Sequence, residues 1–148
     1  MTIRYQHTQR GTLMIVVLIV GTAVLASAAA LQPVPLCWVG LVLAVGTAIM
    51  AGLFSSLTVI ADDDEVRWYF GPGAWSYRLP VTDIESVRVV RNSWLNGFGI
   101  RMRPGFRLYN VSGLDAVELK LKSGEIRRIG TDDAAGLAAA LAGDRISR

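Results

Sequence analysis

Two uninterrupted apolar stretches, residues 12–31 and 36–57, constrain this chain more than any other feature. Neither stretch contains a charged residue. Each is about twenty residues long, which as an α-helix spans roughly 30 Å, the thickness of the hydrocarbon core of a bilayer. A chain of 148 residues is too short to bury two such helices in a soluble core. The sequence therefore predicts an integral membrane protein with two transmembrane helices.

The charged residues divide the chain into two parts. All twelve acidic residues follow position 58, as does every basic residue except Arg4 and Arg10. We therefore predict an N-terminal tail and helical hairpin over residues 1–57 and one polar domain over residues 58–148. The thirteen bases and twelve acids of that domain leave a net charge of +1, which argues against nucleic acid as a partner.

The connection between the two stretches, residues 32–35, contains two prolines. Proline interrupts a helix, so the chain turns here and both ends of the hairpin lie on one side of the membrane. Arg4 and Arg10 precede the hairpin. Arg67 and Arg78 follow it, whereas the connecting loop has no Lys or Arg. By the positive-inside rule, both termini are predicted to be cytoplasmic.

A cleavable secretory signal is the alternative to the first transmembrane helix. Arg4 and Arg10 precede an apolar run that reaches Ala26-Ser27-Ala28, which is similar to a signal cleavage site. The run continues to Leu31, which favours a transmembrane helix. Even after cleavage, the second span would return the polar domain to the cytoplasm.

Small residues recur at every fourth position along both apolar stretches. Such rows allow helix backbones to approach closely, which drives helix association in lipid. The simpler interpretation is that the two rows pack on each other within the hairpin, and the alternative is contact with another chain. The residues are Gly40, Ala44, Ala48 and Gly52 in the second stretch, and Thr22, Ala26 and Ala30 in the first.

Beyond residue 54, short alternating segments predict about seven antiparallel strands and a C-terminal helix. The alternation at Val66, Trp68 and Phe70 is typical of a half-buried strand. The predicted helix follows a cap at Thr131 and has Ala134, Leu137, Ala138 and Leu141 on one buried face. The predicted strands are residues 54–61, 66–70, 75–79, 86–92, 100–111, 117–121 and 125–129.

Four short motifs in the polar domain carry a family resemblance. They are Arg91-Asn92-Ser93-Trp94, Gly97-Phe98-Gly99-Ile100, Leu108-Tyr109-Asn110-Val111-Ser112-Gly113 and Ile129-Gly130-Thr131-Asp132. Over residues 54–142 the chain resembles bacterial membrane proteins that join a two-helix hairpin to a pleckstrin-homology-like (PH-like) domain. The resemblance implies a PH-like antiparallel β-barrel with a C-terminal capping helix, in a bacterial plasma membrane. It implies no activity and no catalytic residues.

Arginines and aromatic residues cluster in sequence around a glycine-rich segment. Because the second helix runs into the first strand with almost no linker, the polar domain must lie close to the lipid headgroups. Basic residues near an anionic leaflet contribute roughly 1 kcal/mol each, and aromatic residues suit the interface. We predict that this cluster contacts lipid headgroups or the acidic surface of a partner, and the alternative is an ordinary solvated strand face. The residues are Arg88, Arg91, Trp94, Phe98, Arg101, Arg103 and Arg107.

Catalytic and cofactor sites find little support in the sequence. One cysteine, Cys37, and one histidine, His7, cannot make up a zinc site or a Cys–His nucleophile. Gly97-Phe98-Gly99 lacks the third glycine of a dinucleotide fingerprint. We therefore predict no cofactor, no metal and no catalytic residue.

Three functions are carried forward in order. The first is a non-enzymatic membrane protein whose PH-like domain binds lipid headgroups or protein at the cytoplasmic surface. The second is an accessory subunit of a larger membrane complex, with other integral membrane proteins or further copies of this chain as partners. The third is an enzyme of unknown type.

Overall fold

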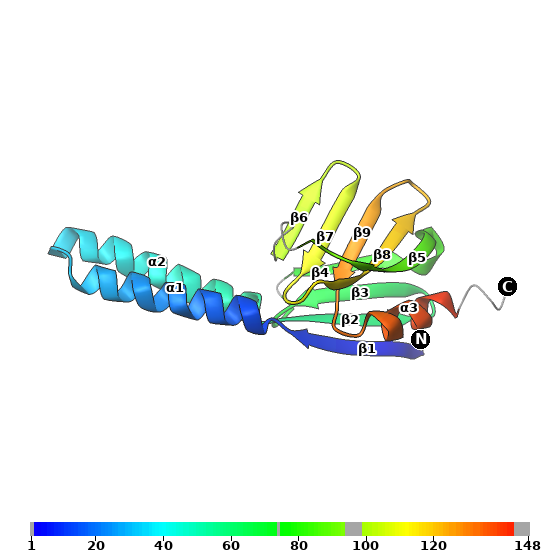
Figure 1. The fold of residues 1–148 in the computed structure, drawn as a ribbon, viewed down its shortest axis with the longest axis horizontal. Helices are drawn as coiled ribbons and strands as arrows, with labels where there is room; N and C mark the ends of the chain where they lie inside the picture. Colours follow the sequence, from blue (N-terminus) through cyan, green and yellow to red (C-terminus); the bar gives the residue numbers. More distant parts are fainter. Residues whose placement is uncertain (1, 74, 94–98, 144–148) are drawn as a thin grey trace.

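The computed structural model describes residues 2–73, 75–93 and 99–143 of the chain. A helical hairpin projects from one end of a β-rich domain, and the N-terminal strand lies within that domain (Figure 1). The elements in chain order are β1 (Ile3–Arg10), α1 (Thr12–Ala30), α2 (Val34–Leu53), β2 (Ser56–Asp62), β3 (Glu65–Phe70), β4 (Trp75–Pro80), η1 (Val81–Asp83), β5 (Ile84–Arg91), β6 (Gly99–Arg103), β7 (Phe106–Asn110), β8 (Asp115–Leu121), β9 (Ile126–Gly130) and α3 (Ala134–Ala142).

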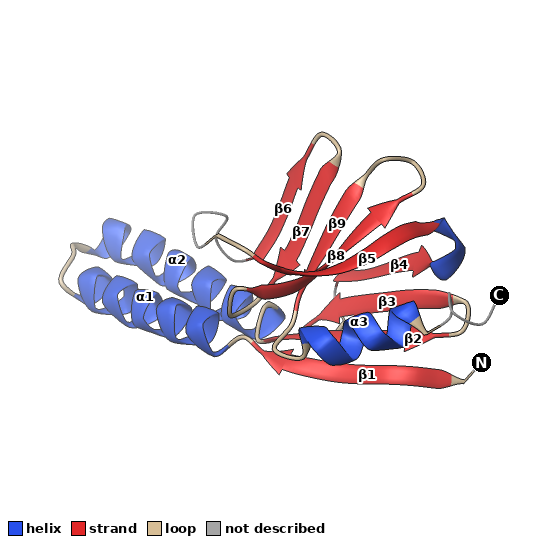
Figure 2. Ribbon diagram, turned by 45° about the vertical axis from the view of Figure 1, so that its right-hand side comes forward, coloured by secondary structure: helices blue, strands red, loops and turns tan. Residues whose placement is uncertain are grey.

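Helices α1 and α2 form the hairpin, and both are long and apolar enough to cross a membrane. Mean hydropathy reaches 2.6 over Thr12–Ala30 and 2.2 over Leu36–Leu53, while only 6% of each segment is buried. Figure 2 shows the pair extending away from the β domain. An apolar surface of this size is far larger than a soluble monomer normally exposes. The structure thus contains the two apolar helices that the sequence predicts.

The second helix is shorter than predicted. It ends at Leu53, whereas the predicted span reached residue 57. Phe54 follows the last helical residue, and Leu57 is a residue of β2 that is only 1% exposed. Residues 54–57 therefore include side chains of the domain core, and hydropathy alone does not distinguish such residues from a membrane span.

The N-terminal tail forms strand β1, which the sequence does not predict. β1 pairs with β2 in antiparallel fashion, with Arg10 opposite Ser56. Its less exposed positions include His7 and Gln9, so the strand lacks the apolar alternation that identifies a strand in sequence. Gln9 satisfies its side-chain amide by donating to the Ser112 carbonyl at 2.8 Å. The helical hairpin is thus inserted between two neighbouring strands of one sheet.

The described strands form two sheets. The first has the order β1-β2-β3-β4 and the second has the order β5-β8-β9-β7-β6. All neighbouring strands are antiparallel except β7 and β9, which are parallel. The predicted single barrel of about seven strands differs from this arrangement, because β1 adds a strand and the turn at Pro104-Gly105 separates β6 from β7. Among the described residues, no hydrogen-bonded strand pair joins the two sheets.

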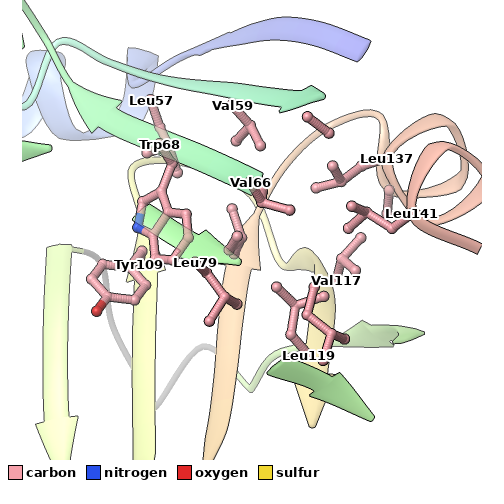
Figure 3. Close-up of a cluster of buried hydrophobic side chains, with 14 of the residues drawn as sticks. Leu57, Val59, Val66, Trp68, Leu79, Tyr109, Val117, Leu119, Leu137 and Leu141 are labelled. Carbon is pink, nitrogen blue, oxygen red and sulfur yellow. The ribbon is translucent and has the colours of Figure 1, made fainter. Parts of the chain in front are cut away.

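The core lies between the two sheets and beneath α3. Trp68 of β3 and Tyr109 of β7 are both fully buried, and their rings meet edge to face at 5.1 Å between centroids. Leu137 and Leu141 of α3 join the same apolar cluster (Figure 3). Each fully buried side chain of this size contributes roughly 1.5–3 kcal/mol, so α3 is an integral part of the domain.

The C-terminal helix is confirmed, with a different cap from the predicted one. Ala134, Leu137 and Leu141 are buried, as their spacing predicts. The cap is Asp133, whose carboxylate accepts a hydrogen bond from the Gly136 N–H at 3.0 Å. Thr131 instead accepts a hydrogen bond from the Asp133 N–H, so it stabilises the turn before the helix.

Candidate functional site

The candidate arginines that the structure describes lie on the second sheet, and the strand register divides them between its two faces. Successive side chains of a strand point to opposite faces. Tyr109 of β7 and Val117 of β8 are fully buried in the core, which identifies the core-facing positions of the neighbouring strands. The outward positions carry Arg88, Arg101 and Arg103, and the core-facing positions carry Arg91 and Arg107. The arginines that cluster in sequence therefore do not form one surface.

An ion pair occupies the centre of the outward face. Arg128 of β9 contacts Glu118 of β8 at 2.8 Å and donates to Asn92 Oδ1 at 3.2 Å. Its guanidinium carbon lies 5.2 Å from the centre of the Phe106 ring, within the range of a cation–π contact. The neutralised centre leaves the excess positive charge of this face at its flanking strands.

Strand β6 places two of the outward arginines next to the hairpin. β6 is an edge strand of its sheet, and a Cβ added to its first residue, Gly99, would lie 3.7 Å from the Met14 Cε in the first turn of α1. Figures 1 and 2 both show β6 beside the end of the hairpin that joins the domain. Arg101 and Arg103 are exposed and make no ion pair with the described residues. Met102 between them is 59% exposed.

The two core-facing arginines have acidic neighbours. Arg107 Nε lies 3.0 Å from Glu125 Oε1. Arg91 is exposed and lies opposite Asp115 of β8 in the register. These two arginines are thus less available to an external anion than those of β6. The two predicted aromatic contacts, Trp94 and Phe98, lie outside the described residues.

Two of the predicted helix-packing residues contact the other helix of the hairpin. A Cβ added to Gly40 would lie 2.4 Å from the Cβ of Ala29, so this approach requires glycine. Ala29 is 8% exposed and Ala44 is 4% exposed. Close packing between α1 and α2 therefore involves Gly40 and Ala44.

The other predicted packing residues face outward hollows or open space. Thr22, Ala26 and Ala48 line an apolar hollow of about 330 Å³ on the hairpin surface. Ala26 and Ala30 line a second apolar hollow of about 260 Å³. A Cβ added to Gly52 would meet no atom within 4 Å. Contact of these residues with another chain stays a prediction.

The sequence analysis did not identify a polar cluster that surrounds Tyr109. Arg107 of β7 and Arg127 of β9 share the Glu125 carboxylate, and Tyr109 lies two residues along β7 on the same face. The cluster exists because β7 and β9 pair in parallel, which brings residues 107 and 127 side by side. No local sequence pattern identifies a parallel pairing between strands that lie about twenty residues apart.

Among the described residues, no group of three or more His, Cys, Asp or Glu side chains is placed to hold a metal ion. No protein-family model, no curated protein and no solved structure matches the chain. The function must therefore be argued from the geometry of the chain itself.

Proposed function

We propose that this chain is a non-enzymatic integral membrane protein that holds an interaction domain against anionic lipid headgroups. In this proposal α1 and α2 cross a bacterial plasma membrane, and both termini are cytoplasmic. Residues 58–148 form the interaction domain, to which β1 adds a strand. The order of strands followed by a helix that covers the core supports a PH-like relationship for this domain.

The junction between the hairpin and the domain supports a fixed orientation at the membrane. α1 follows β1 after Gly11, and α2 precedes β2 with Phe54 and Ser55 between them. The Gly11 N–H donates to the Ser55 carbonyl at 2.8 Å, so the two strands begin to pair where the helices end. A Cβ on Gly11 would lie 2.7 Å from the Phe54 carbonyl oxygen, which shows how closely the two chain segments approach. A domain joined in this way cannot move far from the headgroups.

The position of β6 is the observation that carries the proposal. An edge strand beside the end of a membrane-spanning hairpin lies at the level of the headgroups, and here it presents the exposed Arg101 and Arg103. Each basic residue near an anionic leaflet contributes roughly 1 kcal/mol, so the pair contributes roughly 2 kcal/mol. The exposed Met102 between them adds an apolar side chain suited to the interface.

Fluorescence quenching in nanodiscs tests this contact. The full chain carries Cys37→Ala to remove its native thiol, and a fluorophore is attached to Met102→Cys or, as a distant reference, to Ser123→Cys in the turn between β8 and β9. Nanodiscs contain phosphatidylcholine alone or mixed with phosphatidylglycerol, with spin-labelled lipid as the quencher. We expect stronger quenching at position 102 than at position 123, with a further increase in phosphatidylglycerol.

The arginines are tested in the same assay by a matched pair of variants. Arg101→Gln/Arg103→Gln should remove the phosphatidylglycerol-dependent increase, because roughly 2 kcal/mol corresponds to about a 30-fold change in the contact equilibrium. Arg88→Gln/Lys120→Gln removes two charges from exposed positions on β5 and β8 and should leave the increase intact. Equal quenching at positions 102 and 123, or an unchanged increase in the first variant, contradicts the proposal.

A role as an accessory subunit of a larger membrane complex is the second candidate. The observation that favours it is the pair of apolar hollows on the hairpin, which Thr22, Ala26 and Ala48 help to line. Small residues at such hollows suit the approach of a further helix. Purification in mild detergent distinguishes the two candidates, because an accessory subunit retains other membrane proteins in fixed stoichiometry.

A further inference from the structure

The second sheet extends past the first on one side of the core. Figures 1 and 2 show β6, β7 and β9 continuing beyond β4, the edge strand of the first sheet. In this part of the domain, Arg107 of β7 and Arg127 of β9 are register neighbours on the core-facing side. Two guanidinium groups are thus held side by side on a face that is only partly covered.

One carboxylate holds both guanidinium groups through the same kind of atom. Glu125 Oε1 lies 3.0 Å from Arg107 Nε and 2.9 Å from Arg127 Nε. Among the described residues, the terminal nitrogens of the two groups have no hydrogen-bond acceptor. Arginine presents five N–H donors in a planar fork, and its terminal nitrogens suit a carboxylate or a phosphate.

Tyr109 adds a buried donor to these cations. Its side chain is fully buried, and its hydroxyl has no hydrogen-bond partner among the described residues. Burial raises the pKa of the Tyr109 hydroxyl, and the nearby Arg107 and Arg127 act in the opposite direction. Figure 3 shows the hydroxyl directed away from the apolar cluster. A buried hydroxyl without a partner is rare and is often explained by a bound group.

A hollow of about 340 Å³ adjoins this cluster at Arg127. Leu79 of β4 and Leu121 of β8 form its apolar wall. Its polar rim consists of Asp83, Lys122, Ser123, Glu125 and Arg127. Pockets for small molecules have volumes of about 300 Å³ and above and combine apolar walls with a few polar groups.

We infer that this cleft binds a small molecule through an oxyanion, either a phosphate or a carboxylate. Arg107, Arg127 and Tyr109 donate to the oxyanion, and Leu79 and Leu121 contact the apolar part of the ligand. Three cations, with Lys122, face two carboxylates in and beside the hollow, so a singly or doubly charged anion improves the charge balance. The site is separate from Arg101 and Arg103 of β6 and does not depend on headgroup contact.

Thermal unfolding of the full chain in an uncharged detergent tests the site. The probes are inorganic phosphate, acetate and glycerol phosphate. We expect at least one probe to raise the melting temperature in a saturable way. Tyr109→Phe and Arg107→Gln should each weaken that response by about tenfold or more, because each removes a donor to a charged acceptor. Arg88→Gln, on the opposite face, should respond like the wild type.

The same variants separate a binding role from a structural one. Without a probe, Tyr109→Phe should be at least as stable as the wild type, because it removes a buried hydroxyl that has no partner. Equal responses in all four proteins mean an adventitious ion only and overturn the inference, as does the absence of any response. Saturation by short-chain phosphatidylglycerol but by none of the three probes would also overturn it in favour of a lipid headgroup.

Discussion

Replacement of Gly40 by alanine tests the packing of the hairpin at a single atom. The added Cβ would lie 2.4 Å from the Cβ of Ala29 and 3.1 Å from its Cα. Carbon atoms in contact normally lie about 3.5–4.0 Å apart. A Cβ has no rotamer through which to move away, so the two helices must separate by roughly 1 Å or more at this level.

The same substitution at Gly52 provides a matched control. Gly52 belongs to the same helix and the same row of small residues, but its added Cβ would meet no atom within 4 Å. Both substitutions gain up to about 1 kcal/mol of helix propensity, so the difference between them isolates the clash. Overpacking of this kind costs about 1–3 kcal/mol. We therefore expect Gly40→Ala to be less stable than Gly52→Ala by that amount.

Denaturant titration of both full-length variants in detergent micelles measures the difference in the free energy of unfolding. Equal free energies of unfolding would refute the packing of Gly40 against Ala29. A loss of the same size at both positions would instead indicate that the whole row of small residues packs against something in common, as an interface with another chain requires.

Two further predictions concern the β domain. Leu137→Ala, at a fully buried position of α3, should lower the free energy of unfolding by about 2–5 kcal/mol, whereas Ala139→Ser at an exposed position of the same helix should change it by less than about 0.5 kcal/mol; urea titration compares the two, and similar small losses contradict the packing of α3. Hydrogen bonding from the Glu65 N–H lowers the pKa of the Asp62 carboxyl below its ordinary value of 3.8. Because the folded-state pKa is the lower one, the stabilisation is present above about pH 4 and is lost as the pH falls through the folded-state pKa. Unfolding of Asp62→Asn should therefore depend less on pH in this acidic range, and an unchanged pH dependence would contradict the assignment.

Local periodicity was sufficient to predict the elements that carry a regular apolar pattern. The two apolar helices follow from their length and lack of charge, and α3 follows from the spacing of Ala134, Leu137 and Leu141. β1 could not be predicted, because less exposed positions of this strand carry His7 and Gln9. Its place in the sheet depends on pairing with β2, across the whole length of the hairpin.

The candidate site was predictable only within a single strand. Arg101 and Arg103 are two residues apart, so they share a face, whereas Arg88 and Arg91 are three residues apart and lie on opposite faces. Which face points to the core depends on the pairing of distant strands. The cluster of Arg107, Arg127 and Tyr109 depends on the parallel pairing of β7 with β9, which no local pattern indicates.

Thiol accessibility in intact cells and inverted membrane vesicles tests the central claim most directly. The full chain with Cys37→Ala carries one new thiol, either at Gln32→Cys in the hairpin loop or at Ser123→Cys in the domain. The account predicts that a membrane-impermeant reagent labels position 32 only from outside the cell and position 123 only from the cytoplasmic side. Labelling of both positions from the same side would show that the hairpin does not cross the membrane, and the proposed function would then be wrong.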